Sequence, residues 1–321
     1  MIQSSDLAER SRVYPLVELQ GVKVRIPHPD EVPKCEYMKR GDLLEKVLAA
    51  WMTLDGIPPL NFRLYGPPGV GKNALVYECA RLLGKPLYSM VGHSELGPED
   101  VACSARITSM DTIEYVASPL FAAMLGGGVF FFDEIAKAPP AALNPLAAVL
   151  DERRTLSSVL AGINIKAHPE FLFCAALNED EELGGQLPQF IQERLIPAIH
   201  VGMPAGDELA KILRSHLRML DAKWVDVYMS EFWRRGEISP RDAKKHIQFA
   251  HSLGTAAGQA RASDLEIREY LRKAGDKECE ARSAQETQGE VEPAPSPQEK
   301  EKIDEQFIPF FPKRRRNKTT H

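Results

Sequence analysis

The stretch GPPGVGKN, residues 66–73, decides the fold. It has the spacing of a phosphate-binding loop, G-x-x-x-x-G-K followed by Ser or Thr, at every position except the last. Three glycines let the backbone turn tightly and point its N–H groups at phosphate oxygens, while Lys72 reaches the terminal phosphates. Asn73 stands where a hydroxyl normally coordinates magnesium. The loop therefore predicts an ATP site and leaves open whether ATP is hydrolysed or only held.

The residues on either side of this phosphate loop support the same interpretation. The stretch NFRLY precedes it as a strand, and NALVYECARLLG follows as a helix that ends at Gly84. Phosphates would then lie at the N-terminus of a helix, which attracts anions. The alternative, a Gly/Pro turn that carries a lysine by chance, does not explain both flanks. The residues expected to bind the nucleotide are Gly66, Pro67, Gly69, Val70, Gly71, Lys72, Asn73 and Ala74.

A second motif, GGVFFFDEIAKAPP, combines a buried strand with two carboxylates at its carboxyl end. Ligands bind at that end of the strands in open α/β sheets, and buried charge needs a partner. Asp133, together with Asn73, is the expected magnesium ligand, and Glu134 is the expected general base that polarises the attacking water. The alternative is an acidic pair that starts a helix, favoured by the helix dipole.

Three further polar residues are candidates for the same chemistry. Asn178 ends the apolar strand FLFCAAL and could orient a water or the terminal phosphate, although an Asn after a strand is commonly a turn residue. Arg194 in PQFIQERLIP and Arg241 in ISPRDAKK lie near the ends of elements, and either could instead be a solvated surface charge. Phosphoryl transfer requires positive charge on the developing oxygens, so their functional interpretation requires assembly with copies of the chain.

The pattern along the chain predicts an α/β fold followed by a helical region. The stretches NFRLY, PLYSM, GVFFFDE, FLFCAALN and PAIHVG alternate with helical patterns, which is typical of a mostly parallel sheet covered by helices. From Pro204 to Gly275 only helical patterns follow. We expect an N-terminal lead-in with short strands and an amphipathic helix over 1–57, a nucleotide-binding core over 58–204, an all-helical lid over 205–275, and an acidic disordered linker over 276–321 that ends in FIPFFPKRRRNKTTH.

Composition restricts where the chain works and what it binds. Its 321 residues are 44% hydrophobic, yet no apolar run approaches the roughly 20 residues that a membrane span needs, and no signal peptide is apparent, so we expect a cytoplasmic protein. The five scattered cysteines indicate neither disulfides nor a zinc site. A net charge of −5 disfavours nucleic acid, for which KRRRNK is the single supporting feature. The tail FIPFFPKRRR is either a docking peptide or a solubilising basic end.

Taken in order, these motifs resemble those of AAA+ ATPases. GPPGVGKN, FFFDEIAKAPP, CAALNED, QLPQFIQERLIPAIHVGMP and ISPRDA look like the Walker A, Walker B, sensor 1, arginine-finger and sensor 2 regions, and DEIAKAPP and SPR are similar to the MoxR-like branch. The resemblance implies an αβα core with a mostly parallel five-stranded sheet, β-hairpin insertions within residues 92–125 and 152–171, and a helical lid. It also implies ATP and Mg²⁺ as ligands, a homo-oligomeric ring such as a hexamer, and a protein client served with a partner that carries a von Willebrand factor A (VWA) domain.

The resemblance assigns roles and also reveals departures. It implies that Arg194 is a finger that reaches a neighbour's nucleotide and that Arg241 is a lid arginine. Asn73 replaces Thr or Ser, and its amide oxygen can ligate magnesium from one atom farther out. Leu195 replaces an aromatic residue, and Lys137 occupies an interval that commonly holds Arg. Two hypotheses follow: an ATP-driven ring that remodels a protein client, or a nucleotide-gated scaffold whose hydrolysis is slow because of Asn73. A nucleic-acid motor is the third and weakest alternative.

Overall fold

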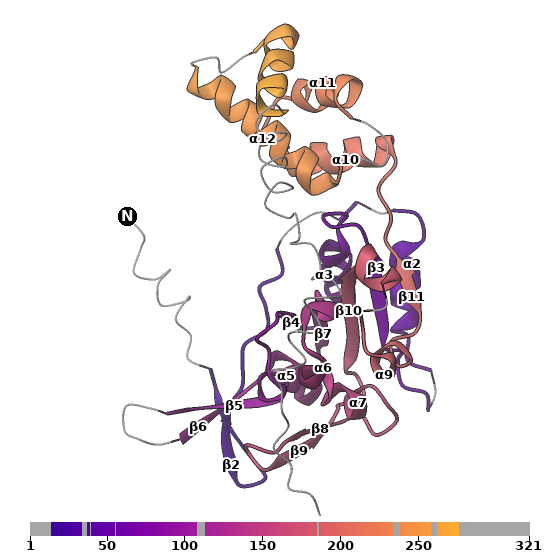
Figure 1. Ribbon diagram of the computed structural model, residues 1–321, viewed down its shortest axis with the longest axis vertical. Helices are drawn as coiled ribbons and strands as arrows, with labels where there is room; N and C mark the ends of the chain where they lie inside the picture. The colour runs from indigo at the N-terminus through magenta and orange to yellow at the C-terminus, as the bar shows by residue number, and fades with distance from the viewer. Residues whose placement is uncertain are drawn as a thin grey trace, which may run out of the picture. The chain divides into compact units, whose positions relative to one another are not determined.

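The centre of the molecule is a five-stranded sheet. The computed structural model describes residues 14–33, 37–38, 40–54, 56–107, 113–184, 186–233, 238–257 and 262–275. The sheet has the order β11-β3-β10-β7-β4, and every neighbouring pair is parallel (Figure 1). Its strands are β3 (Phe62–Gly66), β4 (Leu87–Val91), β7 (Val129–Asp133), β10 (Leu172–Asn178) and β11 (Ala198–His200). The predicted α/β fold is confirmed, and the sheet is parallel throughout.

Helices cover both faces of this sheet, and the side-chain alternation of β7 explains why. Phe131 belongs to the apolar cluster on one face, whereas Phe130 and Phe132 belong to the cluster on the other. All three rings are fully buried, as expected for a parallel sheet packed on both sides. The first face is covered by α2 (Leu43–Ala50) and α3 (Lys72–Leu82), and the second by α5 (Pro119–Gly126), α6 (Pro140–Leu143), α7 (Leu146–Val149) and α9 (Gln189–Gln192).

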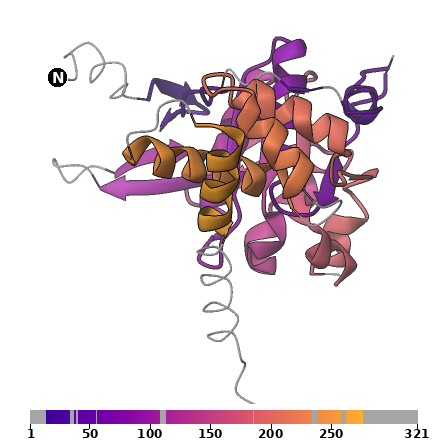
Figure 2. The same cartoon turned by 90° about the horizontal axis from the view of Figure 1, so that it is seen from above.

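Two β-hairpins interrupt the alternation of strands and helices, as expected. One follows the short helix α4, and the other lies between α7 and β10. The elements concerned are α4 (Pro98–Val101), β5 (Cys103–Ile107) with β6 (Ile113–Ala117), and β8 (Thr155–Ser158) with β9 (Ile163–Lys166). The predicted N-terminal strands, β1 (Leu16–Leu19) and β2 (Val22–Arg25), join the first hairpin, because β2 pairs in parallel with β6. This gives a second sheet of order β1-β2-β6-β5. Figure 1 draws β2, β5 and β6 together, and Figure 2 gives the view of the chain from above.

Helices follow the sheet, as the sequence pattern predicts. They are α10 (Gly206–His216), α11 (Lys223–Glu231), α12 (Pro240–Ala256) and a helical stretch over residues 264–275. The sheet, both hairpins and α10–α12 belong to one compact unit that ends at Leu271. Within the described ranges, none of the helices has the length and apolar character that a membrane crossing requires. The predicted linker and the FIPFFPKRRR tail lie outside the described residues.

Candidate functional site

The phosphate loop connects β3 to α3 and is tightly enclosed by neighbouring backbone. A Cβ atom added to Gly66 would lie 2.2 Å from the Val201 carbonyl oxygen, so only glycine fits beside the end of β11. Gly69 has a φ of +78°, and a Cβ there would lie 2.5 Å from Ser239 Oγ. Ser239 caps α12, because its Oγ accepts a hydrogen bond from the Asp242 N–H. The loop therefore contacts both the sheet and the start of α12.

Lys72 lies at the end of the loop, as the first residue of α3, and is only 7% exposed. Its Nζ donates to the Gly66 carbonyl over 2.7 Å, to the Pro67 carbonyl over 3.2 Å and to Asn178 Oδ1 over 3.3 Å. Burial lowers the pKa of Lys72, and the charge of Asp133 opposes this effect. The ammonium group thus bridges the phosphate loop and the end of β10, from where it can reach terminal phosphates.

The parallel register brings the predicted polar residues to one edge of the sheet. Asn178 pairs with Gly66, and Asp133 pairs with Val91 on the outer strand β4. Asn178 also precedes α8 (Glu179–Leu183), and its N–H donates to Glu181 Oε2 over 2.7 Å. This capping contact fixes the backbone of Asn178 while its side chain points to Lys72.

Asn73 and Asp133, the two predicted magnesium ligands, contact each other. Asn73 Nδ2 donates to Asp133 Oδ2 over 2.7 Å, and the Glu134 N–H donates to Asp133 Oδ1 over 3.0 Å. An amide oxygen and a carboxylate are hard oxygen ligands that suit Mg²⁺, which commonly takes its other ligands from water and substrate phosphate. No cluster of three or more His, Cys, Asp or Glu able to hold a metal occurs among the described residues. The pair fits a magnesium ion that is shared with a nucleotide.

Glu134, the predicted general base, is paired with a lysine three residues later. Its Oε2 lies 3.0 Å from Lys137 Nζ, across the 3₁₀ helix η1 (Ile135–Lys137). Glu134 itself has a φ of +52°, an uncommon backbone conformation for a residue other than glycine. Hydrogen bonding to Glu134 raises the pKa of Lys137, so the lysine is charged at neutral pH. The carboxylate is therefore held beside the loop by an ion pair.

One cavity of about 360 Å³ collects most of the predicted site residues. Its lining includes residues 68–74 of the phosphate loop and helix α3, together with Asp133, Glu134, Asn178 and Arg241. Arg241 comes from the first turn of α12. Residues that the sequence spreads over 170 positions thus surround a single space that has cationic, anionic and amide groups on its walls.

Arg194 is the one predicted catalytic residue that does not line this cavity. It follows α9, donates from one guanidinium nitrogen to the Phe190 carbonyl over 2.7 Å, and lines a different groove beside Asp151 and Arg153. That groove of about 780 Å³ shares no lining residue with the phosphate cavity. Within one chain, the structure therefore does not bring Arg194 to the phosphate loop.

A second cavity that the sequence did not reveal adjoins the phosphate loop. It measures about 220 Å³ and has a mainly apolar lining: Tyr37, Met38, Arg40, Gly69, Val70, Gly71, Ala74, Ile212, His216, Pro240, Arg241 and Lys244. Burial raises the pKa of Tyr37 to about 12 and lowers that of His216, so both side chains are neutral at pH 7. Arg40 donates to the carbonyls of Val70 and Gly202. No motif joins these distant residues. A charged residue inside an apolar strand, such as Arg63 in NFRLY, is by contrast a local signal that the buried charge has a partner.

Comparisons with known proteins agree with this geometry. Residues 61–195 match the family model described as an AAA domain of the dynein-related subfamily. The chain is 32% identical over 182 residues to the denitrification regulatory protein NirQ of Pseudomonas aeruginosa, which covers 55% of this chain and 66% of NirQ. It is 30% identical over 173 residues to the uncharacterized protein YojN of Bacillus subtilis, covering 53% and 57%. The chain thus spans less than two thirds of the length of these curated relatives.

Solved structures share the fold at low sequence identity. Thermotoga maritima RuvB superposes with a TM-score of 0.52 at 19% identity, covering 75% of this chain and 73% of RuvB. NtrX from Brucella abortus superposes with a TM-score of 0.53 at 13% identity, covering 84% and 57%. These similarities to solved structures concern the fold alone. The sequence motifs and the curated relatives indicate the family. The chain belongs to the MoxR-like family of AAA+ ATPases.

Proposed function

We propose that the protein is an ATP-hydrolysing ring, most simply a hexamer, that remodels, activates or assembles a protein client. One observation carries the proposal: Lys72, Asp133, Glu134 and Asn178 surround one cavity, whereas Arg194 lies in a groove apart from it. A finger that completes the site of a neighbouring copy has to be separated from its own phosphate loop in this way.

Each residue has a definite task in the proposed reaction. The loop N–H groups and Lys72 hold the phosphates, and Asn178 orients the attacking water. Glu134 takes the proton of that water as its oxygen bonds to the terminal phosphorus and the bond to the ADP oxygen breaks. Mg²⁺, when bound through Asn73 and Asp133, would neutralise phosphate charge. Arg241, from the helical lid proposed for residues 205–275, and Arg194 from a neighbour supply the remaining positive charge.

The client is proposed to be a protein, served together with a VWA-domain partner in the cytoplasm. Both hairpins carry exposed apolar side chains near their tips: Val159 is 96% exposed and Ile107 is 77% exposed. Such side chains suit contact with another polypeptide. The relative NirQ is a denitrification regulatory protein, and regulation of this kind fits action on another protein system.

A second candidate function is a nucleotide-gated scaffold that hydrolyses ATP slowly. The specific observation in its favour is the hydrogen bond between Asn73 and Asp133, because it occupies one oxygen of the metal-binding carboxylate. A metal bound by Asp133 would have to share or displace that contact. Retention of Glu134 and Arg194 favours the hydrolytic function, since a scaffold does not need a general base or a finger.

Magnesium-dependent ATP hydrolysis, measured per subunit over a series of protein concentrations, distinguishes the two functions. The hydrolytic ring predicts a rate per subunit that rises with concentration, because Arg194 acts between copies. Glu134→Gln should abolish turnover while nucleotide binding persists. If the wild-type protein binds ATP but hydrolyses it only after Asn73→Thr, the scaffold is the correct function.

A further inference from the structure

Arg63 is a charged residue within β3, three positions before the phosphate loop begins. Its backbone pairs with Ala175 of β10 on one side and Ala198 of β11 on the other. The side chain is only 12% exposed. Burying a charge costs free energy unless hydrogen-bonding partners compensate for it. The partners of the Arg63 guanidinium therefore show which segments of the chain it connects.

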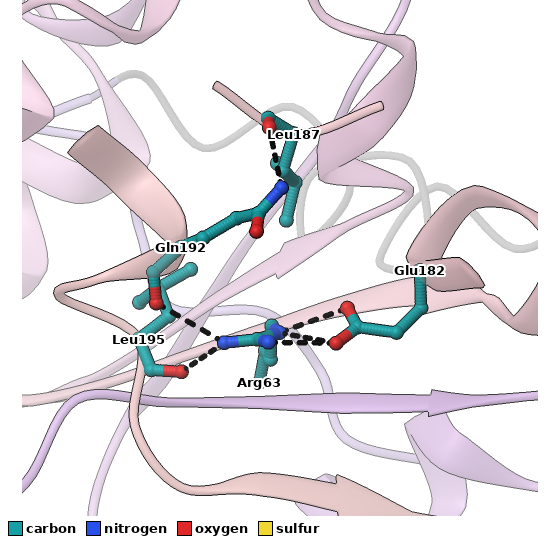
Figure 3. Close-up of polar contacts among 5 residues, drawn as sticks. All are labelled: Arg63, Glu182, Leu187, Gln192 and Leu195. Atoms are coloured by element: carbon teal, nitrogen blue, oxygen red, sulfur yellow. Dashed lines mark hydrogen bonds and ion pairs between the residues drawn. The ribbon is translucent and has the colours of Figure 1, made fainter. Parts of the chain in front are cut away.

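The side-chain hydrogen bonds of Arg63 go to two segments far along the chain (Figure 3). Nε lies 3.1 and 2.8 Å from the two carboxylate oxygens of Glu182, and a terminal nitrogen lies 2.6 Å from Oε1. The other terminal nitrogen donates to the Leu195 carbonyl over 2.6 Å and to the Gln192 carbonyl over 3.2 Å. The guanidinium thus uses its planar fork on a carboxylate and on two backbone carbonyls at once.

The two carbonyls lie on either side of Arg194 in the sequence. Gln192 is the last residue of α9, and Leu195 directly follows Arg194. Arg63 therefore binds the turn that carries Arg194 on both sides of that residue. The same turn is tied back by Gln192 Nε2, which donates to the Leu187 carbonyl over 2.7 Å (Figure 3). Leu195 is fully buried, so its side chain also anchors the turn.

Glu182, the carboxylate partner of Arg63, connects Arg63 to the phosphate cavity. Glu182 lies on α8, the helix that Asn178 caps and whose Glu181 accepts the Asn178 N–H. Asn178 in turn contacts Lys72. Arg63 therefore joins the strand that enters the phosphate loop, the helix that begins at Asn178, and the turn that carries Arg194.

We propose that Arg63 is a positioning residue for the finger: through Glu182 and the carbonyls of Gln192 and Leu195, it sets the orientation in which Arg194 meets the nucleotide of a neighbouring copy. This inference rests on the proposed function, because it requires that Arg194 acts between copies. Arg63 itself does not line the phosphate cavity, so its effect passes through the turn.

The first test compares conservative variants of the Arg63–Glu182 pair with a variant of a second ion pair of similar exposure. Arg63→Lys keeps a charge for Glu182 but cannot hold both carbonyls, and Glu182→Gln keeps the shape but removes the charge. Each should lower kcat about tenfold or more, since small displacements of a catalytic group have effects of this size, and leave the Kd of a fluorescent ATP analogue within twofold of wild type. Arg25→Lys, which alters a pair of similar exposure with Glu114, should keep kcat within twofold.

The second test separates positioning of the finger from general damage to the site. Arg63→Lys is mixed with Glu134→Gln, a variant that supplies Arg194 but cannot hydrolyse. The Arg63→Lys sites should regain most of the wild-type rate next to these neighbours, as should Arg194→Ala sites in the same experiment.

The outcomes distinguish failure of this inference from failure of the proposed function. Wild-type kcat in both Arg63→Lys and Glu182→Gln, alongside an impaired Arg194→Ala, would overturn the inference. So would rescue of Arg194→Ala, but not of Arg63→Lys, by Glu134→Gln. If Arg194→Ala alone hydrolyses ATP at the wild-type rate, the finger role of the proposed function is wrong, and the inference falls with it.

Discussion

Asn73 donates its side-chain amide hydrogen to Asp133 across 2.7 Å. In a loop with Ser or Thr at this position, a single hydroxyl oxygen both donates a hydrogen bond and offers a lone pair to the metal. An amide divides these two tasks between its nitrogen and its oxygen. The replacement therefore keeps both capacities while moving the metal-binding oxygen one atom farther from the backbone.

We expect Asn73→Ala to weaken magnesium-dependent nucleotide binding about tenfold, because it removes both a metal ligand and a partner of Asp133. Asn73→Thr should restore the binding. The measurement is titration of a fluorescent ATP analogue at several Mg²⁺ concentrations. Binding without Mg²⁺ should be nearly equal in all three proteins, and an equal loss with and without the metal would show that Asn73 serves only to hold the loop.

Removal of Lys137 should free the general base. The ion pair between Lys137 and Glu134 is partly exposed, and such pairs contribute about 0.5 kcal/mol. Lys137→Met should therefore raise the steady-state rate of ATP hydrolysis about twofold, the change that this energy corresponds to. The double variant with Glu134→Gln must stay inactive. A reduced rate in Lys137→Met would mean that the pair holds Glu134 in its productive position.

Arg40 should be needed for a stable phosphate loop. Arg40 is 7% exposed and its guanidinium donates to the carbonyls of Val70 and Gly202, so Arg40→Met leaves both without this donor. We expect the free energy of unfolding in urea to fall by about 1–3 kcal/mol and nucleotide binding to weaken. Lys46→Ala, which removes an exposed pair with Asp42, is the control and should change stability little. Equal effects of the two variants would contradict the prediction.

Glu114 should make the stability of the hairpin sheet sensitive to acid. Hydrogen bonds from Arg25 and Arg106 lower the pKa of Glu114 to about 2, from an ordinary value of 4.5. Because the folded pKa is lowered, the stabilisation is complete above pH 4.5 and is lost as the pH falls toward 2. Glu114→Gln should lower the midpoint of thermal unfolding at pH 7, and the difference from wild type should shrink steadily below about pH 4.5. A difference that does not vary with pH would exclude this origin.

Much of the fold and of the phosphate cavity could be predicted because the signals are local. The loop, the strand that ends in Asp133 and the strand that ends in Asn178 are each continuous stretches. A parallel sheet brings the carboxyl ends of its strands to one edge, so their polar residues had to be neighbours. The five predicted strands all occur in the sheet.

What could not be predicted depends on pairing between distant segments. Tyr37 and His216 line the same cavity although almost 180 positions separate them, and neither belongs to a motif. The parallel pairing of β2 with β6 joins the N-terminal strands to a hairpin about 90 residues later, and strand periodicity does not encode a partner. The position of Arg194 in a separate groove likewise depends on the turn that Arg63 holds.

The strand order also has a consequence for how the protein is made. β3 enters the phosphate loop, yet both of its neighbours in the sheet, β10 and β11, are synthesised last among the strands of the core. β3 lacks β10 until the ribosome has passed Asn178 and lacks β11 until it has passed His200, and the Asn178 that contacts Lys72 is among the last groups of the cavity to emerge. We therefore expect the nascent chain to acquire ATP affinity late, in one step, once β10 and β11 close around β3.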